Sequence, residues 1–226
     1  MSSYKVHSLF ALILSLFYFL NPIYCLLTIL GANISDFDHD VKKTELYKMT
    51  IIGLTIFITL YVLKSSYFIG VLILLMVIIF YFSKHRGFTH SLVGGLVLTS
   101  LIFAMIFFSM EISYQIPSNL NIDSSAILEL ISVLLCILFV NKKISYIIIG
   151  FFVLWILMFP VTMINLKFVA FSIFLGFLSH LILDSFSPTG VELLNPFSSK
   201  KFGRKFSIFM TFLLIIIVII YKTPII

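Results

Sequence analysis

The sequence predicts an all-α fold, a polytopic transmembrane helical bundle with about eight membrane segments. Of its 226 residues, 61% are hydrophobic and only 11% are charged, whereas a soluble domain carries about 25% charged residues. Apolar runs near the length of about 20 residues that a spanning helix needs recur along the chain. The runs at 71–80 and 215–220 lack the alternation of polar and apolar residues expected of a β-barrel strand, so helices are favoured.

Polar clusters divide the apolar runs into candidate segments. We expect a single integral membrane domain over residues 1–226. One segment is short, because 15 residues of helix span only about 22 Å at 1.5 Å per residue. Cys25 and Cys136 both lie in apolar stretches and are expected to be core or lipid-facing residues. The segments cover residues 8–32, 49–63 (the short one), 66–83, 91–110, 125–140, 144–164, 166–183 and 206–222.

The first segment has two interpretations, and they place His7 on opposite faces of the membrane. A single span over 8–32 leaves His7 a bilayer away from Asp36. Asn21-Pro22 interrupts the segment near its middle, and proline breaks a helix because it lacks an N–H and clashes with the preceding turn. A re-entrant hairpin broken at Pro22 would return His7 to the face that carries Asp36. We favour the hairpin, whose bend would need burial in protein.

The basic residues divide unequally between the two faces. With Lys5 left aside, eleven lie on the face of the Asp36 loop and three on the other, so the positive-inside rule places the Asp36 face in the cytoplasm. We expect the protein in the plasma (inner) membrane. The net charge of +6 is spread through loops, so no nucleic-acid partner is expected. The eleven are Lys42, Lys43, Lys48, Lys84, Arg86, Lys142, Lys143, Lys200, Lys201, Arg204 and Lys205, against Lys64, Lys167 and Lys222.

Most of the histidines and aspartates fall into three clusters, which this topology brings to the same face. In the third cluster, His180 and Asp184 lie four residues apart, so a helix stacks them on one face. Imidazole and carboxylate together suit zinc, and carboxylate also suits manganese or magnesium. A hydrogen bond at a helix end is the alternative, but ionisable residues near a membrane are candidates for function.

The first and second clusters are candidate ligand loops. Asp36-Phe37-Asp38-His39 offers alternate carboxylates and an imidazole, although a solvated acidic turn or a helix N-cap would look the same. His85-Arg86-Gly87-Phe88-Thr89-His90-Ser91 places two histidines around a glycine, and Arg86 has a planar fork suited to phosphate. Thr89 or Ser91 could cap the next helix or donate to an oxyanion. A basic cytoplasmic loop would explain Arg86 but not both histidines.

Together these motifs resemble a family described as membrane-bound metal-dependent hydrolases, some of them LexA-regulated. The resemblance spans about residues 7–205. The family itself is remotely similar to zinc-dependent phospholipase C and single-strand nucleases. One departure is Ser35, where the family often has proline. The matching residues are His7, Asp36 through His39, His85 through Ser91, Ser179-His180-Leu181-Ile182-Leu183-Asp184, Pro188-Thr189-Gly190-Val191 and Asn195-Pro196-Phe197.

The resemblance implies a metal-dependent hydrolase that acts on a phospholipid or another membrane-associated phosphoester. One or two divalent cations, zinc first and manganese or magnesium next, would activate water as the nucleophile. Arg86 would stabilise the phosphate charge and His39 would act as a ligand or as an orienting residue. The expected metal ligands are His7, Asp36, Asp38, His85, His90, His180 and Asp184.

Two other classes of function stay open at this stage. A metal-ion or proton transporter would use intramembrane histidines and aspartates as a relay, but the segment interiors are almost uncharged. A non-catalytic membrane protein with a structural metal site would bind metal without turnover. Membrane lipid is the expected partner, and the sequence leaves the oligomeric state open.

Overall fold

The computed structural model describes residues 4–37, 43–83, 87–115, 124–140, 142–158 and 164–222. It confirms the all-α prediction, since the described part of the chain is a helical bundle whose only β-type pairing is the isolated bridge between Val191 and Phe202. The α-helices are α1 (Tyr4–Tyr18), α2 (Pro22–Ile34), α4 (Lys43–Val62), α5 (Phe68–Phe82), α6 (Leu92–Glu111), α7 (Ser124–Phe139), α8 (Lys142–Met158), α9 (Leu166–Ser185) and α10 (Arg204–Lys222).

The first predicted segment is a helical hairpin, which confirms the interpretation with a break at Pro22. Helix α1 ends at Tyr18 and α2 begins at Pro22, where the Asn21 side chain accepts a hydrogen bond from the Ile23 N–H at 2.9 Å. At the other end, the Asn33 amide donates to the Ser8 hydroxyl at 2.9 Å and holds the two arms together. Every residue of α2 is buried, so protein surrounds the inner arm, as a re-entrant helix requires.

Helices α2 and α9 lie close together because glycines remove side chains from their contact. A Cβ on Gly31 would lie 2.0 Å from the Ile173 carbonyl oxygen, and one on Gly176 would lie 1.9 Å from the Thr28 carbonyl oxygen. Small residues at helix contacts allow this approach in membrane proteins, where packing supplies much of the attraction between helices. The α2–α9 pair is therefore the centre of the bundle.

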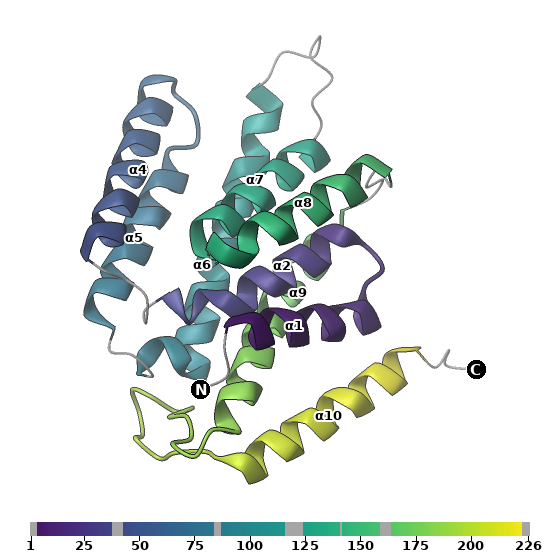
Figure 1. Cartoon of the computed structure of the whole chain (residues 1–226). Coiled ribbons are helices and arrows are strands. Elements are labelled where there is room, and N and C mark those ends of the chain that lie inside the picture. Colours follow the sequence, from purple (N-terminus) through teal and green to yellow (C-terminus); the bar gives the residue numbers. More distant parts are fainter. Residues whose placement is uncertain are drawn as a thin grey trace.

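The remaining helices surround this pair. Figure 1 shows α4 and α5 as a separate antiparallel hairpin beside α6 and α7, and α10 along the lower edge. The Tyr18 hydroxyl donates to the Leu214 carbonyl at 3.3 Å and fastens α10 to α1. Cys25 and Cys136 are both fully buried and unbridged, so both are core residues rather than lipid-facing ones.

Within the described residues, three helices are long and apolar enough to cross a bilayer: Thr44–Val62, Leu92–Glu111 and Leu166–Ser185. Shorter apolar helices accompany them. The first of these helices corrects the predicted segment 49–63, which was expected to be short. The helix begins at Lys43 and continues through polar residues such as Glu45 and Lys48, which pair at 2.8 Å on its exposed first turns.

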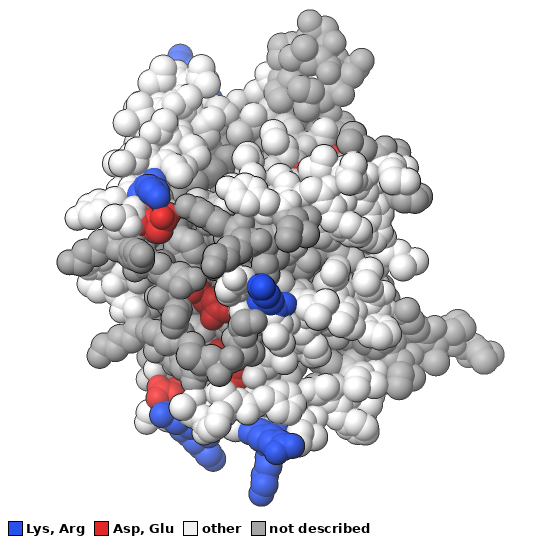
Figure 2. Space-filling model, in the orientation of Figure 1, with Lys and Arg blue, Asp and Glu red and all other residues white. Residues whose placement is uncertain are grey.

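The surface agrees with a membrane location. In Figure 2, Lys and Arg occupy a few separate places on the visible face, and several gather at the lower edge, where α10 begins in Figure 1. Large apolar side chains such as Phe68, Phe107 and Phe151 are exposed along the helices. An apolar exterior of this kind is stable in lipid, as the composition predicts.

The segment between α9 and α10 is an ordered loop over 186–203. Val191 and Phe202 pair through two backbone hydrogen bonds of 3.0 and 2.8 Å. Gly190 has a φ of +65°, a conformation that favours glycine. The Leu92 N–H at the start of α6 donates to the Leu193 carbonyl at 2.9 Å, so the loop lies against the segment that carries His90.

Candidate metal centre

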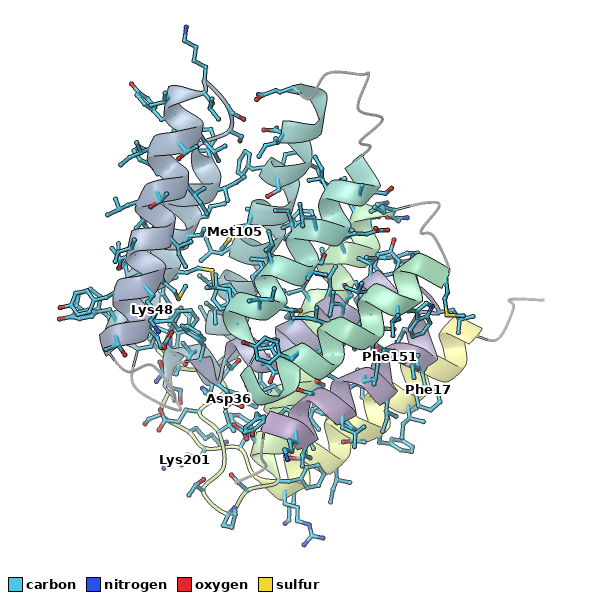
Figure 3. The ribbon with its side chains drawn as sticks, turned by 45° about the horizontal axis from the view of Figure 1, so that its top comes forward. Phe17, Asp36, Lys48, Met105, Phe151 and Lys201 are labelled. Carbon is cyan, nitrogen blue, oxygen red and sulfur yellow. The ribbon has the colours of Figure 1, made fainter. Side chains whose placement is uncertain are left out.

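Four separate segments meet at one end of the bundle and bring the described histidines and aspartates together. Figure 1 shows the first turns of α1, the last turns of α2 and α9 and the start of α6 converging at the lower left. Figure 3 places Asp36 at the same end of the molecule as Lys201 of the 186–203 loop, with Met105 farther into the bundle. The five side chains are His7 (α1), Asp36 (after α2), His90 (before α6), and His180 and Asp184 (both α9).

Asp184 is the central carboxylate of this group, because its two oxygens face different histidines. Its Oδ2 lies 3.3 Å from Nε2 of His180 and 3.5 Å from Nε2 of His90. Its Oδ1 lies 3.5 Å from Nε2 of His7. The i, i+4 spacing predicted from the sequence therefore places His180 and Asp184 side by side on α9, and both are buried.

Asp36 closes the opposite side of the centre. Its Oδ1 lies 3.8 Å from Nε2 of His90 and 3.8 Å from Nε2 of His180. Two carboxylate oxygens and two imidazole nitrogens thus form a four-cornered set, Asp36 Oδ1, His90 Nε2, Asp184 Oδ2 and His180 Nε2. Asp36 is the most exposed corner, with 29% of its side chain accessible, while His90 and His180 are fully buried.

His7 joins the centre because α1 returns to this face. Its ring stacks on that of His180, with the ring centroids 4.2 Å apart and the planes at 26°. It contacts the Asp184 oxygen that faces away from His90 and His180. His7 therefore lies beside the four-cornered set and is not a member of it. It reaches the site because α1 and α2 form a hairpin.

The separations between these polar atoms suit a metal ion better than direct hydrogen bonds. Hydrogen bonds to nitrogen are about 2.7–3.2 Å long, whereas these contacts are 3.3–3.8 Å. Ligand atoms about 2.0–2.2 Å from a tetrahedral zinc ion lie about 3.3–3.6 Å from one another. Neither ring nitrogen of the buried His180 makes a hydrogen bond with a described residue. The two contacts of Asp184, 3.3 and 3.5 Å, fall in that range and the two of Asp36, both 3.8 Å, lie just beyond it, so the donor set could hold a divalent cation.

Two overlapping groups of three ligands are close enough to share an ion, with ligand atoms within 4.8 Å of one another. One contains His7, His180 and Asp184, and the other contains Asp36, His90 and His180. His180 belongs to both, so the described ligands make one compact centre rather than two separate sites.

Thr89 supplies an orienting contact that the sequence analysis assigned differently. Its hydroxyl lies 3.3 Å from Nδ1 of His90. A histidine that offers Nε2 to a metal carries its proton on Nδ1, and a partner there fixes the ring orientation. The capping role belongs to Ser91, whose hydroxyl accepts the Gly94 N–H at 3.0 Å. The position of Thr89 next to His90 in the sequence is the signal that could have predicted this contact.

Electrostatics keep Asp36 in the form that binds cations. Burial alone raises the pKa of its carboxyl group, because desolvation disfavours the charged form. The attraction of His180, the contact with His90 and the field of His7 act in the opposite direction. Their sum holds the pKa of Asp36 below its usual value, so this carboxylate is ionised at neutral pH.

Four of the residues predicted for the site lie outside the described residues: Asp38, His39, His85 and Arg86. Their roles as ligands, orienting residue or phosphate contact stay predictions. By sequence, the first two follow Phe37, and the other two precede Gly87.

A family model described as YdjM inner membrane protein covers residues 5–225 of the chain, which includes every predicted site residue. No match was found among the curated proteins or among the solved structures.

Proposed function

The chain belongs to the YdjM inner membrane protein family, and we propose that it is a metal-dependent hydrolase of membrane-associated phosphoesters. The observation that carries this proposal is the convergence of His7, Asp36, His90, His180 and Asp184 from four segments. Buried ionisable groups are costly in a membrane protein unless they are paired or functional. Five of them around one point support a function at that point.

Asp36, His90 and His180 would hold one divalent cation, and Asp184, within 3.5 Å of Nε2 of both histidines, would be a further ligand. Zinc is the first expectation, since it takes nitrogen and oxygen ligands together, and manganese or magnesium follows. A bound cation would supply Lewis acidity, activating water and drawing electrons from the phosphoryl oxygen. A second cation beside His7 would need further ligands, for which Asp38, His39 and His85 are the candidates.

The protein residues have separate tasks in this scheme. Asp184 joins the histidines by using both of its oxygens, and Asp36, the most exposed corner, marks the side from which water and substrate reach the centre. Thr89 orients His90. Arg86 would neutralise charge on the phosphate, because its planar fork suits that group.

We place the centre at the cytoplasmic face of the inner membrane. Three lines support this: the family description, the apolar helices, and the excess of Lys and Arg in the loops on the side of Asp36. A phospholipid-type substrate follows from the position of the centre at the ends of membrane helices, and from the resemblance to zinc-dependent phospholipase C.

Metal analysis combined with an activity assay tests the proposal. The full chain is purified in detergent, and its metal content is measured by elemental analysis together with hydrolysis of a chromogenic phosphodiester. We compare His180→Ala and Asp184→Asn with Glu111→Gln, which alters an exposed carboxylate at the far end of α6. The wild type and Glu111→Gln should bind metal and hydrolyse the ester, and the two site variants should do neither.

Two results would count against the proposal. Equal hydrolysis by all four proteins would assign the activity to a contaminant. Stoichiometric metal without turnover, together with unfolding on chelation, would instead identify a structural metal site.

A further inference from the structure

A groove of about 440 Å³ lies between the C-terminal end of α5, the segment before His90 and the 186–203 loop. Its walls are mainly apolar, with Ile78, Ile79 and Phe82 on one side and Phe88 on the other. Ser83 and Asn195 supply the polar groups. The groove is therefore an apolar channel with polar atoms at one end of helix α5.

The groove adjoins a helix with exposed apolar side chains. Ile78 is 53% exposed and Phe82 is 77% exposed, although both belong to an apolar helix. A second groove of about 240 Å³, between α4 and α5, shares these two residues. Two neighbouring apolar channels that share a wall suit a molecule with two hydrocarbon chains.

The other wall of the groove leads to the metal centre. Gly87 and Phe88 line the groove, and His90 follows in the same short helix, Phe88–His90. The Phe88 carbonyl accepts hydrogen bonds from the Ser91 N–H at 3.0 Å and the Ser91 hydroxyl at 2.7 Å. One compact turn therefore presents Phe88 to the groove and His90 to the carboxylates.

The loop on the third side brings positive charge. Asn195 belongs to the 186–203 loop, which also carries the exposed residues Lys200 and Lys201 and continues to Arg204. Figure 3 places Lys201 at the same end of the molecule as Asp36. An apolar groove lined in part by a loop that also carries cations is complementary to an anionic lipid, whose chains are apolar and whose phosphate is negative.

We infer that this groove binds an acyl chain of an anionic phospholipid and thereby sets the phosphoester beside His90. The inference rests on the proposed function and names its substrate class, a long-chain diacyl phospholipid that enters from the membrane side of α5. An acyl chain in the groove exchanges its contact with neighbouring lipid for contact with Ile79 and Phe88. The groove therefore selects the length of the acyl chain, and the metal centre selects the ester.

A binding test that needs no turnover comes first. The full chain is reconstituted in vesicles of phosphatidylglycerol that carry a photoreactive diazirine in one acyl chain, and adducts are located by mass spectrometry. Adducts should concentrate on the peptides with Ile78, Phe82 and Phe88. An even spread over the exposed faces of α4 and α10 would overturn the inference.

A kinetic test follows, with the groove blocked. Ile78→Trp and Ser83→Trp place a large ring in the channel, and Val71→Trp puts the same ring two turns away on α5, outside the groove lining. Hydrolysis of long-chain phosphatidylglycerol is compared with that of its four-carbon-chain analogue. The blocked variants should raise KM for the long-chain lipid at least about tenfold, equal to the contact of about two methylene groups, and should raise KM for the short-chain analogue much less.

The outcomes separate the two proposals. If Val71→Trp raises KM as much as the blocked variants, the groove is not the chain site. If neither lipid is hydrolysed, the proposed function fails, and the adducts still decide whether the groove binds a chain.

Discussion

His7 and His180 stack with their ring centroids 4.2 Å apart, although one lies in the first helix and the other near the end of α9. The contact depends on the break at Pro22, which turns the chain back toward the face from which it started. Nε2 of His7 lies 3.5 Å from the Asp184 oxygen that faces away from the other two histidines. His7 is therefore the ligand whose loss should damage the centre least.

The substitution His7→Ala should lower metal affinity about 10–100-fold, the usual effect of losing a supporting partner, while one ion per chain is retained at saturation. The measurement is competition with a chromophoric chelator, together with elemental analysis. Lys5→Ala, on an exposed position of the same turn, is the control. A fall from two ions to one would show that His7 holds a second cation.

The substitution Thr89→Val keeps the shape of the side chain and removes the hydroxyl that contacts Nδ1 of His90. Metal affinity should fall about tenfold or more, because the imidazole loses the partner that fixes its orientation. Thr89→Ser, which retains the hydroxyl, should restore most of the affinity. Equal affinities for the valine and serine variants would show that this contact has no orienting role.

Glycine substitutions test the α2–α9 contact. Gly176→Val would drive its side chain into the Thr28 carbonyl, and the overpacking should cost about 3 kcal/mol or more. Gly150→Ala in α8 is the matched control, since a Cβ there meets no atom within 4 Å. Thermal unfolding in detergent should show a clearly lower midpoint for the first variant and an unchanged or slightly higher one for the second.

Metal affinity should fall as the pH drops, because protons compete with the cation for the imidazole nitrogens. Asp36 should contribute little to this fall at mildly acidic pH, because its pKa is held below its usual value. Metal titrations between pH 5 and 8 would check the prediction. For Asp36→Asn, affinity should be lower throughout but should fall over the same pH range.

The helical bundle could be predicted because lipid leaves few alternatives to a chain of this composition. The hairpin followed from Pro22, and the meeting of His90, His180 and Asp184 followed from counting segments. The predicted start of α4, residue 49, was wrong. Polar residues such as Glu45 were taken to precede the helix, but they form its first turn.

The geometry inside the centre could not be predicted, because it depends on contacts between distant parts of the chain. Spacing along α9 pairs His180 with Asp184, but nothing local to Asp36 indicates that its Oδ1 faces two histidines from other segments. The contact between Leu92 and Leu193, which brings the 186–203 loop to the start of α6, is equally remote in sequence.

The close approach of α2 and α9 has a consequence for how such a centre can change during evolution. Gly176 precedes His180 by one helical turn, and Gly31 lies on α2 five residues before Asp36. The close approach of the helix that carries His180 to the helix that leads to Asp36 therefore depends on two positions that have no side chain. Adding a single methyl group at either would widen the gap between an unchanged aspartate and an unchanged histidine, so selection for a larger or smaller ion could act on glycines that never touch it.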